Sequence, residues 1–420
     1  MSADRSGSTR RVVGGICLAL VAVASGLVSV GSGAALGDQT PQGKIAYTTW
    51  PMQAGPPCLH VLDLRRAVPK KLVCGPVGEG GGHLGSGIAW SPDGTSLAYK
   101  RAGSRPGIYV VGADGGSAHR VMPLARSEAG ARNIYAAQLS TASWSPDGTR
   151  LVFDRWGDAE YWMCTRKKPS RLRLTVAQLS PAKLVEIPAL TQPTRLKTIG
   201  DLAWSPGGDQ LLYVVFSYRP YKSFGSTECD ITSTSLYTIN TDGSDRRLLV
   251  TARNISLVAW SPDGSTIAYT GCQTGNPATC GLYELSSDGT GRRLLTRVRT
   301  YADAGDPGLN LAWSPLGQSI FVQGRDLYED DATSGARHRV AIPQQVDPGG
   351  CFPEETLLAL SVDGKWLGAV STENFVFNDC KDPLSLRISV IPLDVSAGPL
   401  KSIQIAPTKR GLDSVALHLN

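Results

Sequence analysis

The chain has 420 residues, of which 41% are hydrophobic and 19% charged, with 47 glycines and 27 prolines. This balance is typical of a globular protein rich in turns, and the length suffices for one large repeat domain. The formal net charge of +6 is small for such a length, which argues against nucleic acid as the partner.

Three arginines precede an uncharged stretch over residues 12–37, which ends in small residues. This pattern predicts a secretory signal peptide over residues 1–37, cleaved before Asp38. The alternative is an uncleaved membrane anchor, because 26 uncharged residues are long enough to span a bilayer. The Gly, Ser and Ala content disfavours stable membrane insertion, and the Arg10-Arg11 pair leaves both Sec and twin-arginine export open.

Signal cleavage would lower the net charge to +4 and remove Cys17, leaving eight of the nine cysteines in the mature chain. An even number of cysteines in an exported chain indicates disulfide bonds. We therefore expect an exported protein, either secreted or held in the cell envelope.

A six-residue phrase, Ala-Trp-Ser-Pro-Asp-Gly in its clearest form, recurs along the mature chain. Its tryptophan, replaced by leucine in the last copy, stands at Trp90, Trp144, Trp204, Trp260, Trp313 and Leu360. The spacing between copies is 47 to 60 residues. A repeat of this length fits one four-stranded blade of a β-propeller and is too long for a leucine-rich or ankyrin unit.

The residues around each copy predict a hairpin. Short apolar stretches flank the phrase, as in 256–260 and 266–269. Pro presets φ, Asp caps the turn and Gly takes the positive φ, so the phrase itself is a tight turn. A third stretch such as 281–285, an Asp-Gly turn and a fourth stretch complete the unit. We expect the tryptophan to pack between sheets and the aspartate to serve the turn, not catalysis.

The two ends of the mature chain complement each other. Residues 43–47 match the second strand of a blade, and residues 413–419 match a first strand. Joined, they would complete one blade, close the ring and remove two free sheet edges. The predicted fold over residues 38–420 is a single all-β domain, a seven-bladed β-propeller of four-stranded blades, with six blades as the alternative.

These repeats, followed by Leu-Ala-Tyr as in 97–99, resemble the TolB-type, WD-like propeller repeat. The same repeat occurs in the propellers of prolyl-oligopeptidase-type enzymes. The resemblance covers residues 43–420 and implies an exported envelope protein that binds other proteins.

Two departures limit what the resemblance transfers. TolB resembles a six-bladed propeller preceded by a small α/β domain, and we expect no such domain between Asp38 and Gly43. We also expect no α/β-hydrolase domain with a Gly-x-Ser-x-Gly elbow. No functional residue is therefore transferred position by position.

Strand order assigns the short Asp-Gly turns to one face and the long loops to the other, upper face. Long loops on a rigid scaffold usually carry binding. All eight mature cysteines fall at the upper face, and the topology predicts four sequential pairs: Cys58–Cys74, Cys164–Cys229, Cys272–Cys280 and Cys351–Cys380. Free or metal-bound thiols are the alternative, disfavoured because no Cys-x-x-Cys pair or nearby His cluster is present. We expect neither a metal nor a cofactor.

The two largest upper loops combine aromatic and basic residues. A Cys164–Cys229 bridge would hold them together as one patch, and such residues dominate protein interface energetics. The alternative is that the rings pack the loops onto the rim. The predicted partner-binding residues are Trp156, Tyr161, Trp162, Arg166, Lys167, Lys168, Tyr218, Arg219, Tyr221 and Lys222.

Catalysis requires converging His, Asp or Glu side chains, and no group of them has diagnostic spacing. Acidic pairs such as Asp330-Asp331 and Glu354-Glu355 could in principle bind calcium or act as paired carboxylates. We expect a non-enzymatic, TolB-like protein that binds an envelope or extracellular protein through its disulfide-stapled loops. The alternatives are a carbohydrate-active hydrolase or lyase with carboxylates at the central funnel, and a module that binds a glycan or small ligand.

Overall fold

A computed structural model gives the structure of the chain. It describes residues 28–30, 43–51, 58–66, 68–75, 88–101, 105–123, 142–155, 172–190, 196–223, 226–274, 277–297, 310–323, 327–340, 353–361, 366–373, 386–392, 401–405 and 410–419. These residues form antiparallel β-strands joined by turns, with one short 3-10 helix, η2 (Pro277–Thr279). Within these ranges no helix is long and apolar enough to cross a membrane.

Four strands make each of the first sheets, taken in chain order. The sheet with the order β29-β2-β3-β4 contains β2 (Gly43–Pro51), β3 (Cys58–Asp63), β4 (Pro69–Cys74) and β29 (Arg410–Leu419). The second sheet contains β5 (Ile88–Trp90), β6 (Ser96–Arg101), β7 (Gly107–Gly112) and β8 (His119–Pro123). The third contains β9 (Ser143–Trp144), β10 (Arg150–Arg155), β11 (Arg173–Leu179) and β12 (Ala182–Pro188).

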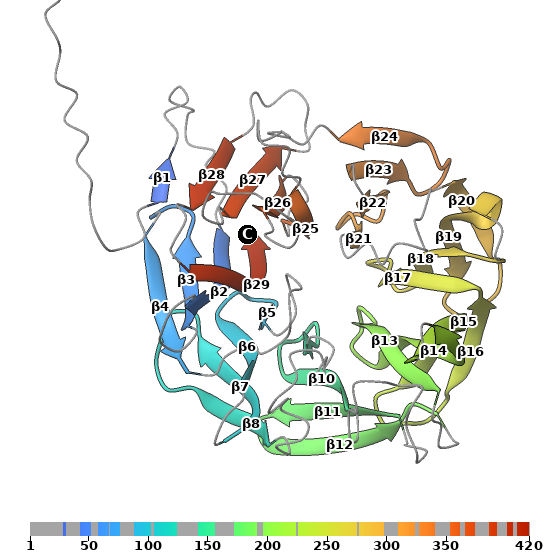
Figure 1. The fold of residues 1–420 in the computed structure, drawn as a ribbon, viewed down its shortest axis with the longest axis horizontal. Helices are drawn as coiled ribbons and strands as arrows, with labels where there is room; N and C mark the ends of the chain where they lie inside the picture. The colour runs from blue at the N-terminus through green and yellow to red at the C-terminus, as the bar shows by residue number, and fades with distance from the viewer. Residues whose placement is uncertain are drawn as a thin grey trace, which may run out of the picture.

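The later sheets repeat this order. They contain β13 (Lys197–Trp204), β14 (Gln210–Ser223), β15 (Ser226–Asn240) and β16 (Arg247–Ala252); then β17 (Asn254–Trp260), β18 (Thr266–Cys272), β19 (Cys280–Ser286) and β20 (Arg293–Arg297). Next come β21 (Asn310–Trp313), β22 (Ser319–Gln323), β23 (Leu327–Asp331) and β24 (Arg337–Val340). The last sheet contains β25 (Pro353–Leu360), β26 (Trp366–Glu373), β27 (Leu386–Pro392) and β28 (Lys401–Ile405). The sheets are arranged around a common centre, toward which the first strand of each sheet lies (Figure 1).

The two ends of the chain join existing sheets. β29 pairs antiparallel with β2, with Lys44 opposite His418 and Tyr47 opposite Val415. β1 (Val28–Val30) pairs with β28 as a fifth strand of the last sheet. β1 lies inside the segment predicted to be the signal peptide, and cleavage before Asp38 stays a prediction.

The hydrophobic core lies between neighbouring sheets. One buried cluster combines Val152 and Leu174 of the third sheet with Trp204, Tyr213 and Ile239 of the fourth. Another combines residues of the fourth and fifth sheets in the same way. Each sheet is therefore stabilised mainly by burying its faces against the sheets beside it.

The motif tryptophans also link the sheets by hydrogen bonds. In three of them the indole Nε1 donates to a backbone carbonyl on the first strand of the preceding sheet: Trp144 to Ala89 at 3.1 Å, Trp204 to Ser143 at 3.0 Å and Trp313 to Ala259 at 3.2 Å. The prediction that the tryptophan packs between sheets is confirmed.

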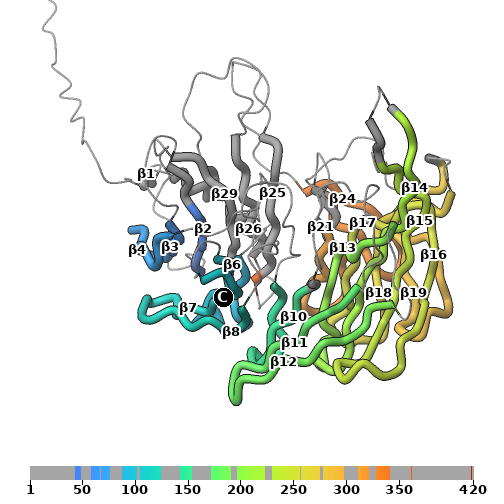
Figure 2. The backbone as a smooth tube through the Cα atoms, turned by 60° about the horizontal axis from the view of Figure 1, so that its bottom comes forward, coloured from blue at the N-terminus to red at the C-terminus, as the bar shows by residue number. Residues whose placement is uncertain are grey.

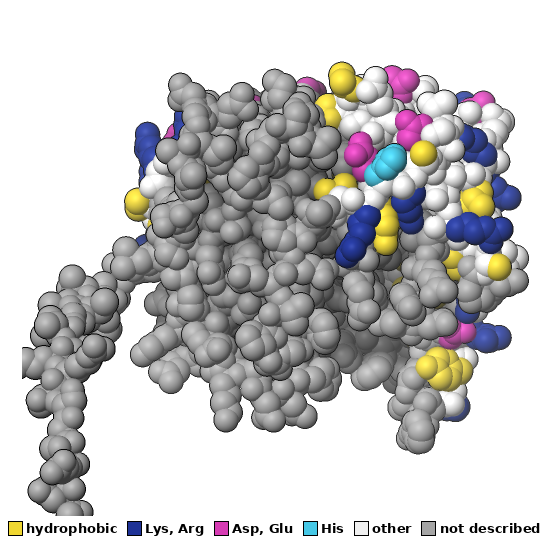
Figure 3. Space-filling view, turned by 90° about the horizontal axis from the view of Figure 1, so that it is seen from above, with side chains coloured by type: hydrophobic (Ala, Val, Ile, Leu, Met, Phe, Trp, Pro, Cys, Tyr) yellow, Lys and Arg dark blue, Asp and Glu magenta, His cyan; other side chains and the backbone are white. Residues whose placement is uncertain are grey.

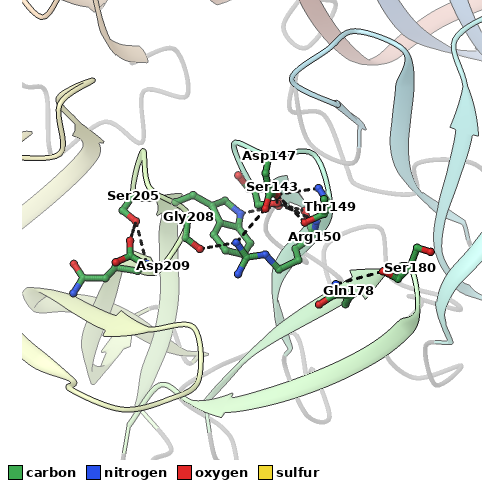
Figure 4. A network of polar contacts seen from close by, with 12 residues as sticks. Ser143, Asp147, Thr149, Arg150, Gln178, Ser180, Ser205, Gly208 and Asp209 are labelled. Atoms are coloured by element: carbon green, nitrogen blue, oxygen red, sulfur yellow. Dashed lines mark hydrogen bonds and ion pairs between the residues drawn. The ribbon is translucent and has the colours of Figure 1, made fainter.

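The motif aspartates cap their turns, as predicted. Asp147 accepts hydrogen bonds from the Ser145 hydroxyl and the Thr149 backbone N–H, and Gly148 takes a φ of +67° (Figure 4). In the fourth sheet Asp209 serves the same purpose by accepting from Ser205 Oγ at 2.9 Å. These carboxylates belong to the scaffold.

Candidate functional site

The longest hairpin of the described chain extends beyond its own sheet. β14 and β15 pair from Gln210–Asn240 to Ser223–Ser226. β13 pairs with β14 only as far as Ser217, and β16 pairs with β15 only from Thr234. Residues 218–223 and 226–231 therefore form a two-stranded projection, here called the ribbon, which rises beyond the neighbouring sheets (Figure 2).

The ribbon replaces one of the two large upper loops that the sequence predicts, the loop that holds Tyr218, Arg219, Tyr221 and Lys222. Polar and apolar residues alternate only weakly in the ribbon, so its sequence lacks the usual pattern of a strand. Its Thr, Tyr and Ile residues nevertheless favour the extended conformation of a strand. A two-stranded ribbon is only marginally stable by itself, so it needs further anchors.

Tyr218 and Cys229 anchor the ribbon. The Tyr218 hydroxyl lies 3.2 Å from Thr198 Oγ1, and burial raises the pKa of Tyr218. Tyr218 was predicted to bind a partner, and the structure places it half-buried against β13, behind a register shift at Ser217. Cys229 is disulfide-bonded, and its partner lies outside the described residues. The Cys164–Cys229 pairing stays a prediction.

Three predicted partner-binding residues lie exposed on the ribbon. The Arg219 side chain is 70% exposed and pairs at 3.5 Å with Asp230, which also lies 3.7 Å from Arg253. Tyr221 is 43% exposed and Lys222 is exposed beside it. Basic, acidic and hydrophobic side chains gather on the projecting part at the lower right of Figure 3. An ion pair this exposed contributes little to stability, so Arg219 remains accessible to a partner.

Six further residues were predicted to bind a partner. They lie outside the described residues: Trp156, Tyr161, Trp162, Arg166, Lys167 and Lys168. Their convergence with the ribbon stays a prediction.

Two of the four predicted disulfides are confirmed. Cys58 and Cys74 stand opposite each other on β3 and β4, and Cys272 and Cys280 do the same on β18 and β19. The second bond closes the turn that contains η2. Cys351 and Cys380 lie outside the described residues.

A central cavity of about 610 Å³ lies between the first strands of four successive sheets. Its lining includes Trp90 on β5, Trp144 on β9, Asp201 on β13 and Leu257 on β17. The remaining described lining residues are small or apolar: Ala89, Pro92, Ala142, Ser143, Gly200 and Leu202.

Asp201 is the functional candidate that the sequence analysis missed. A register shift in β13 between Ile199 and Leu202 places Gly200 and Asp201 at the cavity. Asp201 Oδ1 accepts from its neighbour Leu202 N–H and Oδ2 from Val258 N–H on β17, both at 3.0 Å. Burial raises its pKa. One feature of the sequence could have identified Asp201. It stands three residues before Trp204, whereas no carboxylate stands three residues before the other motif tryptophans.

The acidic pair Asp330-Asp331 is used structurally. Fully buried Asp330 receives two hydrogen bonds from the Arg337 guanidinium, at 2.7 and 2.6 Å. Asp331 accepts from the Ser334 backbone N–H at 2.7 Å and caps a turn. Across the described part of the chain, no three His, Cys, Asp or Glu side chains gather as metal ligands would.

Comparison with known proteins gives a likeness of structure only. No protein-family model matches the sequence, and no curated protein matches it. An oligogalacturonate lyase in complex with manganese matches with a TM-score of 0.54 and 19% identity, covering 82% of this chain and 84% of that chain. A puromycin hydrolase mutant matches with a TM-score of 0.56 and 16% identity, covering 87% of this chain and 53% of that chain. The chain is a β-propeller.

TolB from Acinetobacter baumannii also matches, with a TM-score of 0.41 and 17% identity, over 72% of this chain and 64% of that chain. The chain thus spans less than two thirds of TolB and about half of the puromycin hydrolase. At these identities the likenesses to the oligogalacturonate lyase and the puromycin hydrolase confirm the propeller fold and establish no activity.

Proposed function

We propose that this chain is an exported, non-enzymatic propeller that binds a protein partner in the cell envelope or outside the cell, through the face on which the ribbon projects. One observation carries the proposal: the ribbon breaks the four-stranded repeat and presents exposed Arg219, Tyr221 and Lys222. Arginine and tyrosine are the residue types that dominate binding energy at protein interfaces.

The scaffold suits this purpose. Tyr218 and the disulfide of Cys229 hold the ribbon in place, which reduces the entropy lost when a partner binds. The two disulfides in the described chain and the TolB-type repeat fit a protein that is exported under a signal peptide over residues 1–37.

We also propose that the ring contains seven blades and is closed by β29. The described strands group into seven sheets, and β29 supplies the first strand of the sheet that continues with β2. Closure in this way removes two free sheet edges.

A pull-down from an envelope fraction with the mature chain 38–420 tests the binding proposal. The variant Tyr221→Ser with Lys222→Glu changes the ribbon. The control, Leu184→Ser with Lys183→Glu, makes the same kind of change on exposed residues of β12. We expect a protein that the wild type and the control retain and the ribbon variant loses. Equal recovery by all three, or recovery of no protein, would contradict the proposal.

A carbohydrate-active enzyme is the second candidate. It is favoured by the likeness to oligogalacturonate lyase, which spans most of both chains. Incubation of the wild type with oligogalacturonate and with cell-wall polysaccharides, with and without a divalent cation, would reveal bond cleavage. Turnover would replace the non-enzymatic proposal with this one.

A further inference from the structure

The central cavity combines aromatic rings with one charge. It is lined by Trp90 and Trp144, by apolar residues including Leu257, and by Asp201. Asp201 is the one ionisable side chain among the described lining residues. A volume of about 610 Å³ lies in the range of small-molecule sites, which are mostly apolar with a few placed polar groups.

Among the described residues, no Arg or Lys side chain forms an ion pair with the Asp201 carboxylate. Its two oxygens each accept one backbone N–H, which leaves about two of its four lone-pair sites unused. Burial raises the pKa of Asp201 and outweighs the two backbone N–H bonds, which lower it. A carboxylate in such surroundings gains from any positive charge that enters the cavity.

Asp201 also holds two sheets together. At three described junctions an indole N–H bonds to the preceding sheet, but Nε1 of Trp260 has no partner. At that junction the Asp201 carboxylate accepts the Val258 N–H across the sheets. The backbone therefore fixes the carboxylate in place at the cavity wall, as a preorganised binding group requires.

We propose that the central cavity is a binding site for an organic ammonium ion, with Asp201 as the counter-ion and the indoles of Trp90 and Trp144 as the aromatic wall. Aromatic faces attract ammonium and quaternary ammonium groups, most strongly where water is excluded. The apolar lining accommodates the alkyl body of the ligand. This site is separate from the ribbon, and it does not depend on the proposed protein partner.

Choline and its neutral isostere dimethylbutanol, in which carbon replaces the quaternary nitrogen, test the charge requirement. Titration of each into the mature chain would be followed by calorimetry and by tryptophan fluorescence. We expect choline to bind about tenfold or more tighter than the isostere, which corresponds to about 1.4 kcal/mol. Choline affinity should also fall on acidification, as Asp201 gains a proton, while the isostere's affinity stays constant. Equal affinities, or no binding of either probe, would overturn the proposal.

Variants then assign the effect to Asp201. Asp201→Asn should reduce choline affinity about tenfold and leave the isostere unaffected. Asp209→Asn is the matched control, since Asp209 lies in the turn of the same sheet and bonds Ser205. If Asp201→Asn fails to fold, the pH dependence of choline affinity in the wild type tests the role of Asp201 instead. A folded Asp201→Asn variant that binds choline as tightly as the wild type would contradict the assignment.

Discussion

The turn face and the ribbon use similar residues for different purposes. On the turn face, motif side chains bond within their turn or to the preceding sheet, as Asp147 and Trp204 do. On the ribbon, Arg219, Tyr221 and Lys222 are exposed at the end of two strands that, among the described strands, pair there only with each other. Repetition therefore marks the residues that build the scaffold, and departure from the repeat marks the candidate binding surface.

Removal of β29 should destabilise the scaffold more than any of the substitutions proposed. Deleting residues 410–420 leaves β2 as a free edge and exposes fully buried Ile45 and Ala46. We expect loss of cooperative thermal unfolding, measured by circular dichroism, and rapid proteolysis. Cooperative melting of the truncated chain at the wild-type temperature would contradict ring closure by β29.

Loss of a disulfide should have the next largest effect on stability. Cys58→Ser with Cys74→Ser should lower the free energy of unfolding by about 3 kcal/mol, because the bond closes a loop of sequence separation 16. Cys272→Ser with Cys280→Ser should cost somewhat less, since its separation is 8. Urea unfolding measures both. The reverse order would show that loop entropy is not the main contribution.

Two tryptophans separate packing from hydrogen bonding on the turn face. Trp204 donates to Ser143 and lies under the Arg150 guanidinium at 5.0 Å, whereas Nε1 of similarly buried Trp260 has no partner. Both Trp→Phe changes remove similar ring volume. We expect Trp204→Phe to cost about 1–2 kcal/mol more than Trp260→Phe in urea unfolding. Equal losses of unfolding free energy would show that the hydrogen bond from the Trp204 indole does not stabilise the fold.

Acid should weaken the turns by a smaller amount. The hydrogen bond from the serine hydroxyl, aided by a backbone N–H, lowers the pKa of Asp147 and of Asp263 to about 2. Their stabilisation is present above the unfolded pKa of about 3.9 and is lost as the pH falls through about 2. Asp147→Asn with Asp263→Asn should therefore flatten the fall in melting temperature between about pH 4 and about pH 2. An unchanged slope would assign the acid sensitivity to other groups.

The repeat allowed the fold to be predicted from sequence, because its chemistry is local. Proline, aspartate and glycine set the turn, and the periodic tryptophan sets the packing, so the all-β propeller followed directly. The pairs Cys58–Cys74 and Cys272–Cys280 also followed, since both bonds join adjacent strands.

Tertiary contacts explain what the sequence reading missed. The ribbon was expected to be a loop. Its strands are held by contacts of Tyr218 with Thr198 and by the disulfide of Cys229, and such tertiary contacts are not visible in the local sequence. Asp201 was missed because its place at the cavity depends on the register shift in β13 and on the position of β17. Neither feature can be predicted from an isolated acidic residue in the sequence.

A trimmed ribbon tests the central claim most directly. Residues 218–231 would be replaced by an Asn-Gly turn, with Cys164→Ser to match the loss of Cys229 under the predicted pairing. Thermal melting and partner recovery would be measured on the same sample. We predict a melting temperature within about 3 °C of the full-length Cys164→Ser, Cys229→Ser chain, which lacks the same predicted disulfide, and complete loss of the partner. Partner recovery at the wild-type level by the folded, trimmed chain would contradict the division between scaffold and binding surface.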